Sequence, residues 1–168
     1  MKKILFLACV LSSFKAFSME APKLIGDYND WSAYTFTEGK NTVCYMASSP
    51  KRDEGNYTRR GDIYAVVTHR PAEKSFDVVN FVAGYTLKAN APFTVKIGKE
   101  TFTKFFTEDD KSWTINDDED KKLVKAMFRG ERMIVEATSN RGTKTKDTYS
   151  LKGFAKAYKA INAKCGKK

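Results

Sequence analysis

The chain has 168 residues, of which 42% are hydrophobic and 13% aromatic, and this composition excludes a wholly disordered protein. Its length suits one domain with its own core and leaves no room for two long domains. The formal net charge is +10, and the single histidine, His69, excludes catalytic or zinc sites that need a second histidine.

The first eighteen residues have the pattern of a bacterial signal peptide. Lys2 and Lys3 form a short positive start, residues 4–11 form an apolar run, and Ala16-Phe17-Ser18 fits the small-x-small rule for signal peptidase. The apolar run is too short to span a bilayer, which takes about 20 residues. We therefore predict a signal peptide over residues 1–18.

Cleavage after Ser18 would release a single domain, residues 19–168, into the periplasm or the medium, with no transmembrane segment. It would also remove three lysines and lower the formal net charge from +10 to +7. Two alternatives stay open at this point. One is lipid attachment at Cys9, which follows Leu7-Ala8 as in a partial lipoprotein signal, and the other is an uncleaved N-terminal anchor.

The rest of the chain consists mostly of short β-rich runs separated by turn residues. These runs occupy residues 31–37, 42–48, 63–70, 76–83, 93–97, 101–107, 133–138 and 143–150. Gly98-Lys99 predicts a tight hairpin, and the polar stretch 49–61 predicts a long loop. We interpret Lys144 and Lys146 as protection of an exposed sheet edge.

Two helices are predicted among these strands. Asn116 or Asp117 can cap the first helix, whose first turn is acidic and which ends at Gly130. The second helix is expected over about residues 150–163. One face of this second segment carries Phe154, Tyr158, Ile161 and Cys165.

These elements predict a mainly β fold. We expect an antiparallel, immunoglobulin-like β-sandwich with one or two peripheral helices, one of them C-terminal. A closed barrel would explain the same spacing of strands, and it stays open as the alternative architecture.

Two cysteines, Cys44 and Cys165, remain after removal of the signal peptide. An even number of cysteines in an oxidising compartment favours a disulfide between them. Such a bond would tie the last helix to the sheet and close a loop of about 120 residues. A reactive thiol or an intermolecular bridge are the alternatives.

Few residues point to catalysis. Seven carboxylates lie between Glu108 and Asp120, but they lack the order of a calcium loop, and a solvated turn with a capped helix accounts for them. His69, at the end of a strand, is interpreted as a surface residue with ordinary hydrogen bonds. No Gly-x-Ser-x-Gly, Gly-rich phosphate-loop or Cys-x-x-Cys motif occurs in the sequence. We predict no catalytic residue, bound metal or cofactor; a small hydrolase using the carboxylates of this stretch is the alternative.

Positive charge is the remaining signal. The polar loop carries five residues that we take as a candidate site for an anion or a partner: Lys51, Arg52, Tyr57, Arg59 and Arg60. Nucleic acid is not expected as a partner, because the chain is predicted to be exported. Anionic envelope polymers, lipid headgroups or an acidic protein surface suit that compartment better. Alternatively, the lysines serve only solubility. The oligomeric state is not indicated.

Several short motifs follow one another along the chain. They are Gly26-Asp27, Asp30-Trp31, Cys44, Val82–Leu87 and Ser150–Phe154, the last of which leads into an Ala-rich stretch. In this order they resemble the invasion-associated locus B family. The resemblance implies an exported protein of Gram-negative bacteria with one β-sandwich domain, and the family name implies a part in host-cell entry.

The resemblance implies no active site. We therefore expect a non-enzymatic protein that binds at the cell envelope or a host-cell surface, with an inhibitor or adaptor of another periplasmic protein as an alternative. Many family members carry further cysteines at places where this chain has Tyr34-Thr35 and Phe105-Phe106-Thr107. The Cys44–Cys165 pair is thus expected to be this chain's own arrangement.

Overall fold

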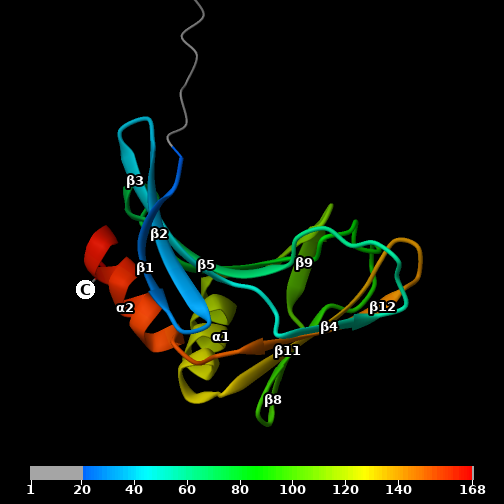
Figure 1. Cartoon of the computed structure of the whole chain (residues 1–168). Helices are drawn as coiled ribbons and strands as arrows, with labels where there is room; N and C mark the ends of the chain where they lie inside the picture. Colours follow the sequence, from blue (N-terminus) through cyan, green and yellow to red (C-terminus); the bar gives the residue numbers. More distant parts are fainter. Residues whose placement is uncertain (1–20, 168) are drawn as a thin grey trace, which may run out of the picture.

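The computed structural model describes residues 21–167. The predicted signal peptide lies outside the described residues. The described chain folds into two antiparallel sheets and two helices, with a short 3-10 helix, η1 (Pro71–Glu73), between two strands. The prediction of a mainly β, sandwich-type fold with a C-terminal helix is confirmed (Figure 1).

The larger sheet has seven strands. In spatial order they are β1 (Lys23–Tyr28), β2 (Trp31–Glu38), β3 (Asn41–Ser48), β5 (Tyr64–Arg70), β6 (Ser75–Val82), β10 (Lys111–Thr114) and β9 (Phe105–Glu108). The smaller sheet has five strands. Their order is β4 (Arg52–Gly55), β12 (Lys144–Ser150), β11 (Arg132–Thr138), β7 (Thr94–Ile97) and β8 (Glu100–Phe102). Because both orders are open, the architecture is two sheets and not one closed barrel.

The core lies between the inner faces of the two sheets and under the helices. Alternate residues of the strands face inward, as the period of two in the sequence predicts. Phe81 of β6 and Phe93, just before β7, lie with ring centroids 5.6 Å apart and join the two sheets. Trp31 is 1% exposed, and its indole N–H donates to the Ser150 carbonyl at 3.0 Å.

Both helices cover parts of the inner face of the larger sheet. The first helix, α1 (Asp117–Arg129), packs on β6 and β10, and α2 (Phe154–Cys165) packs on β1, β2 and β3. Asn116 caps α1 as predicted, since its side chain accepts from the Glu119 N–H at 3.0 Å. No helix of residues 21–167 combines the length and apolar character that a membrane span requires.

The start of α2 depends on a glycine. Gly153 is the N-cap residue with φ +96°, and a Cβ atom there would collide with the carbonyl of Tyr28. Ser150 still belongs to β12, so α2 begins at Phe154 and not at the predicted position 150. At the other end, Cys165 forms a disulfide with Cys44 of β3, which ties α2 to the larger sheet. The predicted cysteine pairing is thus the one in the structure.

Two strand predictions need correction. The polar stretch 49–61 is not all loop, because β4 pairs with β12, from Arg52 opposite Thr148 to Gly55 opposite Thr145. As a result β12 is an interior strand, and the interpretation of its lysines as edge protection is wrong; β4 forms that edge. The predicted strand 101–107 is divided between β8 and β9, which belong to different sheets. Local composition did not reveal the pairing of β4, because its partner β12 lies far along the chain. The division at residues 103–104 was missed for another reason: β8 pairs with the preceding strand β7 and β9 with the following strand β10.

Candidate anion-binding site

A polar cavity of about 590 Å³ opens where three loops meet at one end of the fold. The loop after β4, the segment after β6 and the turn between β11 and β12 contribute its walls. The lining residues are Asn56, Tyr57, Thr58, Arg59, Tyr85, Thr86, Ser139, Asn140, Arg141, Thr143 and Thr145. This set contains hydroxyl, amide and guanidinium groups and no carboxylate.

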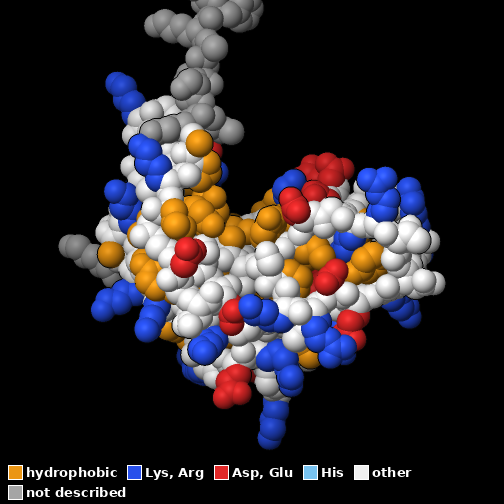
Figure 2. Space-filling model, in the orientation of Figure 1, with side chains coloured by type: hydrophobic (Ala, Val, Ile, Leu, Met, Phe, Trp, Pro, Cys, Tyr) orange, Lys and Arg blue, Asp and Glu red, His pale blue; other side chains and the backbone are white. Residues whose placement is uncertain are grey.

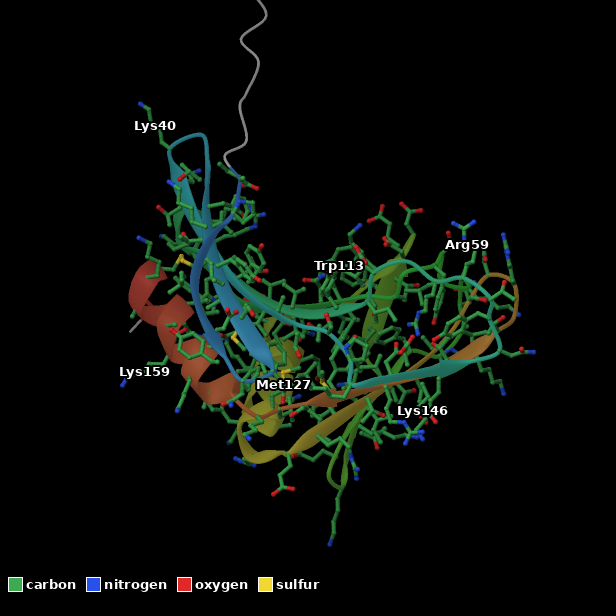
Figure 3. All side chains as sticks on the ribbon, in the orientation of Figure 1. Lys40, Arg59, Trp113, Met127, Lys146 and Lys159 are labelled. Atoms are coloured by element: carbon green, nitrogen blue, oxygen red, sulfur yellow. A yellow bond between two sulfur atoms is a disulfide. The ribbon has the colours of Figure 1, made fainter. Side chains whose placement is uncertain are left out.

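Two arginines carry the positive charge of the cavity. Arg59 and Arg141 are both exposed, and neither has a carboxylate partner within residues 21–167. Other cations of the predicted site are paired: Lys51 lies 2.5 Å from Asp30, and Arg52 lies 3.1 Å from Glu54. The uncompensated charge of this region therefore lies at the cavity, and Figure 3 shows Arg59 at the end of the molecule where the β11–β12 turn lies.

Arg60 has a different role from its neighbour. Its side chain is 4% exposed and forms a two-pronged ion pair with Asp147 of β12, with N–O distances of 2.6 and 2.7 Å. The guanidinium also donates to the Ala83 carbonyl at 2.8 Å. Burial disfavours its charge, but the hydrogen bonds and charge of Asp147 outweigh burial and raise the pKa of Arg60. Arg60 supports the cavity wall and has no free charge for a ligand.

Two tyrosines that line the cavity pack against this buried arginine. The Arg60 guanidinium carbon lies 4.9 Å from the ring centroid of Tyr85 and 5.5 Å from that of Tyr57. The Tyr85 hydroxyl is 2.5 Å from the Thr145 hydroxyl, and burial raises the pKa of Tyr85. Arg60 thus holds together the loop after β4 and the segment after β6.

The backbones of these two segments also touch directly. The Gly61 N–H donates to the Gly84 carbonyl at 2.9 Å. Gly84 has φ +71°, and a Cβ atom there would lie 2.5 Å from the Gly61 carbonyl oxygen. Only glycine permits this close approach of the two backbones, which explains why glycine occupies position 84.

The β11–β12 turn presents Arg141 to the cavity. The Thr143 N–H donates to the Ser139 hydroxyl at 3.1 Å, and the Asn140 N–H donates to the Thr86 carbonyl at 2.8 Å. Guanidinium groups without a carboxylate, surrounded by hydroxyls and amides, are suited to bind a carboxylate, phosphate or sulfate group. The cavity is therefore a candidate anion-binding site, and we call it the anion cavity.

The structure brings together only part of the predicted site. Tyr57 and Arg59 line the cavity, and Arg60 lies beneath it. Lys51 and Arg52 lie elsewhere, one beside Asp30 and the other on β4. Sequence reasoning missed Arg141, Asn140 and Tyr85. The turn Ser139–Gly142 was visible as a turn, but nothing local indicated that it faces residues 56–59.

The carboxylates between Glu108 and Asp120 do not form a cluster in this cavity. Glu119 is paired with Lys104 and Lys122 at 3.0 and 2.8 Å. The buried Asp120 carboxylate accepts from the Val79 N–H at 2.8 Å. Among the described residues there is no group of three or more histidine, cysteine or acidic side chains suited to hold a metal ion. Glu119 and Asp120 thus serve the first turn of α1 through ion pairs and a hydrogen bond, while Asn116 caps the helix.

His69 is buried, which corrects its interpretation as a surface residue. It is 0% exposed; its Nδ1 accepts from the Asp77 N–H at 3.1 Å, and Nε2 lies 2.7 Å from the Asn162 side-chain oxygen. These partners require a neutral ring that carries its proton on Nε2. Burial lowers the pKa of His69, and the positive charge of Lys167 lowers it further. The hydrogen bond with Asn162 and the charge of Asp77 raise it, but burial is the largest effect.

We expect the stability of the protein to fall on mild acidification because of His69. The folded state keeps the ring neutral, so its contribution is complete above the unfolded pKa of about 6.5 and is lost as the pH falls below it. The free energy of unfolding should decrease by up to about 1.4 kcal/mol per pH unit in that range. Urea unfolding between about pH 7 and pH 5 measures this slope. His69→Gln should flatten it; an equal slope in the variant would contradict the assignment.

Comparison with known families supports the resemblance seen in the sequence. The family model described as invasion associated locus B (IalB) protein matches residues 31–162 of this chain. Comparisons with curated proteins and with solved structures give no match. The matched range covers most of the chain, from the buried Trp31 on β2 to Asn162, the partner of His69 on α2.

Proposed function

The chain belongs to the invasion associated locus B family, and on that premise we propose that it is an exported, non-enzymatic protein that binds anionic groups of the cell envelope or of a host surface. Binding takes place in the polar cavity between the loop after β4 and the β11–β12 turn. A part in host-cell invasion, which the family name implies, would follow from binding of this kind.

The observation that carries this proposal is the pair of unpartnered arginines. Arg59 and Arg141 line one cavity with hydroxyl and amide groups and without a carboxylate among the lining residues. Two guanidinium groups can bind one phosphate, sulfate or carboxylate group from two sides. Charge-assisted hydrogen bonds of this type contribute about 1.5–3 kcal/mol each.

Two further observations support export and binding. The Cys44–Cys165 disulfide is typical of proteins that fold in an oxidising compartment. His69 is buried under α2 and hydrogen-bonded on both ring nitrogens, so it cannot act as a general base on a ligand in the cavity. The disulfide supports export, and the burial of His69 argues against a hydrolase that would use this histidine.

The test is an NMR titration with inorganic phosphate and with phosphatidylglycerol vesicles at low salt. We expect shifts in residues 56–59 and 139–143, and at least tenfold weaker binding in the double variant Arg59→Gln/Arg141→Gln. Arg52→Gln is the matched control, since Arg52 is exposed but paired with Glu54. Unchanged affinity in the double variant would remove the cavity from consideration. Binding of vesicles alone would identify a lipid headgroup as the source of the anion.

A further inference from the structure

The outer face of the seven-stranded sheet is apolar and hollowed. Figure 1 shows the β2–β3 hairpin rising on one side and β9 on the other, with β5 running between them. Figure 2 shows hydrophobic side chains gathered in the hollow between these two walls. Three large apolar residues of this sheet are strongly exposed: Leu24 at 54%, Phe106 at 51% and Tyr64 at 37%.

The opposite outer face of the molecule has the character expected of a surface in water. On the five-stranded sheet, Lys96 pairs with Glu136 at 2.6 Å across β7 and β11. Lys146 lies 3.6 Å from Glu54 across β12 and β4, and Arg52 also contacts Glu54. One outer face is thus covered by paired charges, while the other exposes aromatic rings, and this difference points to a ligand for the aromatic face.

Strand register defines which residues lie in the hollow. One row across the sheet consists, strand by strand, of Ser32, Ala47, Val66, Asn80, Trp113 and Phe106. The next row, about 7 Å along the strands, contains Tyr34, Tyr45, Thr68 and Val78. Large rings therefore stand on the outer strands of the hollow, and small or β-branched residues lie on β5 and β6 between them.

Two stacked pairs of rings form the walls. Tyr34 and Tyr45 lie on β2 and β3 with centroids 5.0 Å apart, and Phe106 and Trp113 lie on β9 and β10 with centroids 5.3 Å apart. Within each pair the outer ring covers one face of the inner ring. The inner rings of the two pairs, Tyr45 and Trp113, stand on β3 and β10, which are about 14 Å apart by strand spacing with β5 and β6 between them. Figure 3 shows Trp113 at this hollow.

The floor carries polar groups but no charge. The Thr68 hydroxyl and the Asn80 amide are half-buried, and neither side chain has a hydrogen-bond partner among residues 21–167. The hollow continues into a cavity of about 310 Å³ whose walls include Ser32, Tyr34 and Tyr64, together with Lys51 and Asp30, whose charges are paired with each other. This volume is in the range of small-ligand sites. The surface thus combines flat aromatic faces with free uncharged donors and acceptors.

We propose that this hollow, which we call the aromatic trough, binds a neutral glycan chain. The C–H face of a sugar ring can lie on the negative face of Trp113 or Tyr45, and its hydroxyls can pair with Asn80 and Thr68. An acyl chain would leave these polar groups buried without partners. A second copy of the protein would meet the trough with another hollow surface and leave the floor uncovered.

The aromatic trough and the anion cavity are separate sites. No residue that lines the anion cavity belongs to the two rows of the trough. Glycan binding is therefore independent of the proposed function, and each can fail without the other. Together they would let the protein hold a polysaccharide and a nearby anionic group at the same time.

The test uses tetrasaccharides of N-acetylglucosamine, glucose in β-1,4 linkage and glucose in α-1,4 linkage. Trp113 reports binding by fluorescence, because the other tryptophan, Trp31, is 1% exposed. We expect at least one sugar to change this fluorescence in a saturable way and to bind by calorimetry. Trp113→Phe should keep the calorimetric binding and lose the fluorescence change, while Trp113→Ala should weaken binding about tenfold or more.

Asn80→Leu distinguishes a glycan from an acyl chain. It should weaken sugar binding by about tenfold, because the amide partner is lost, whereas it would not weaken binding of laurate. Thr148→Val, on the outer face of the other sheet, is the matched control. Failure of all three sugars, binding that survives Trp113→Ala, or binding of laurate alone would each overturn the proposal. Arg59→Gln/Arg141→Gln should leave sugar binding unchanged.

Discussion

Replacing Arg60 by methionine is expected to lower the free energy of unfolding by about 3–5 kcal/mol, because it leaves Asp147 as a buried charge without a partner. Both side chains are nearly inaccessible, 4% and 5% exposed, and each carboxylate oxygen accepts one guanidinium N–H. Urea unfolding followed by circular dichroism measures the loss. The same substitution at the adjacent, exposed Arg59 should change stability by less than about 0.5 kcal/mol.

A double variant separates the ion pair from the mere loss of a large side chain. Arg60→Met/Asp147→Leu removes both charges, and we expect it to recover most of the stability lost by Arg60→Met. If the double variant is as unstable as the single one, packing on Tyr57 and Tyr85 and not the ion pair accounts for the effect. The anion cavity should lose its affinity in Arg60→Met as well, since Arg60 holds two of its walls.

Removal of the Cys44–Cys165 disulfide should cost about 4–5 kcal/mol, because the bond closes a long loop, with 121 residues of sequence separation, in the unfolded chain. Urea unfolding compares the free energy of unfolding of Cys44→Ala/Cys165→Ala with that of the disulfide-bonded protein. After treatment with a reductant, the unsubstituted protein should be as unstable as the variant. Amides of α2 should also exchange faster with solvent, since the bond ties this helix to β3. A loss below about 1 kcal/mol would refute the loop-closure account.

The loss of the disulfide in this variant should also affect His69, because it loosens α2. The ring lies under α2, where Asn162 supplies one of its two hydrogen bonds, and Tyr158 and Lys167 reach Asp77 beside it. A helix that opens more often would expose the ring and let it take up a proton. The pH dependence of stability should therefore be weaker in the cysteine variant than in the oxidised protein.

The adjacent arginines Arg59 and Arg60 illustrate what could not be predicted from the sequence. Arg59 and Arg60 are indistinguishable in the sequence, and both were expected to contact a partner. Only Arg60 is buried, in an ion pair with Asp147 of β12. Because this partner lies 87 residues away, nothing near Arg60 in the sequence indicates its burial. The same reason explains Arg141: the turn that carries it is predicted by composition, but its place beside residues 56–59 depends on the pairing of β4 with β12.

Features that depend on neighbours along the chain can be predicted from the sequence. Alternation along each strand, the Asn116 cap and the glycine turns are local, and Cys44 and Cys165 allow only one intramolecular pairing once Cys9 is set aside. The formal net charge of +10 indicates a basic protein, but it does not indicate where on the surface the positive charge lacks a carboxylate partner. The location of the uncompensated charge depends on the fold, because burial, ion pairing and the aromatic trough arise from strands brought together across the sheets. Such contacts leave no local pattern in the sequence.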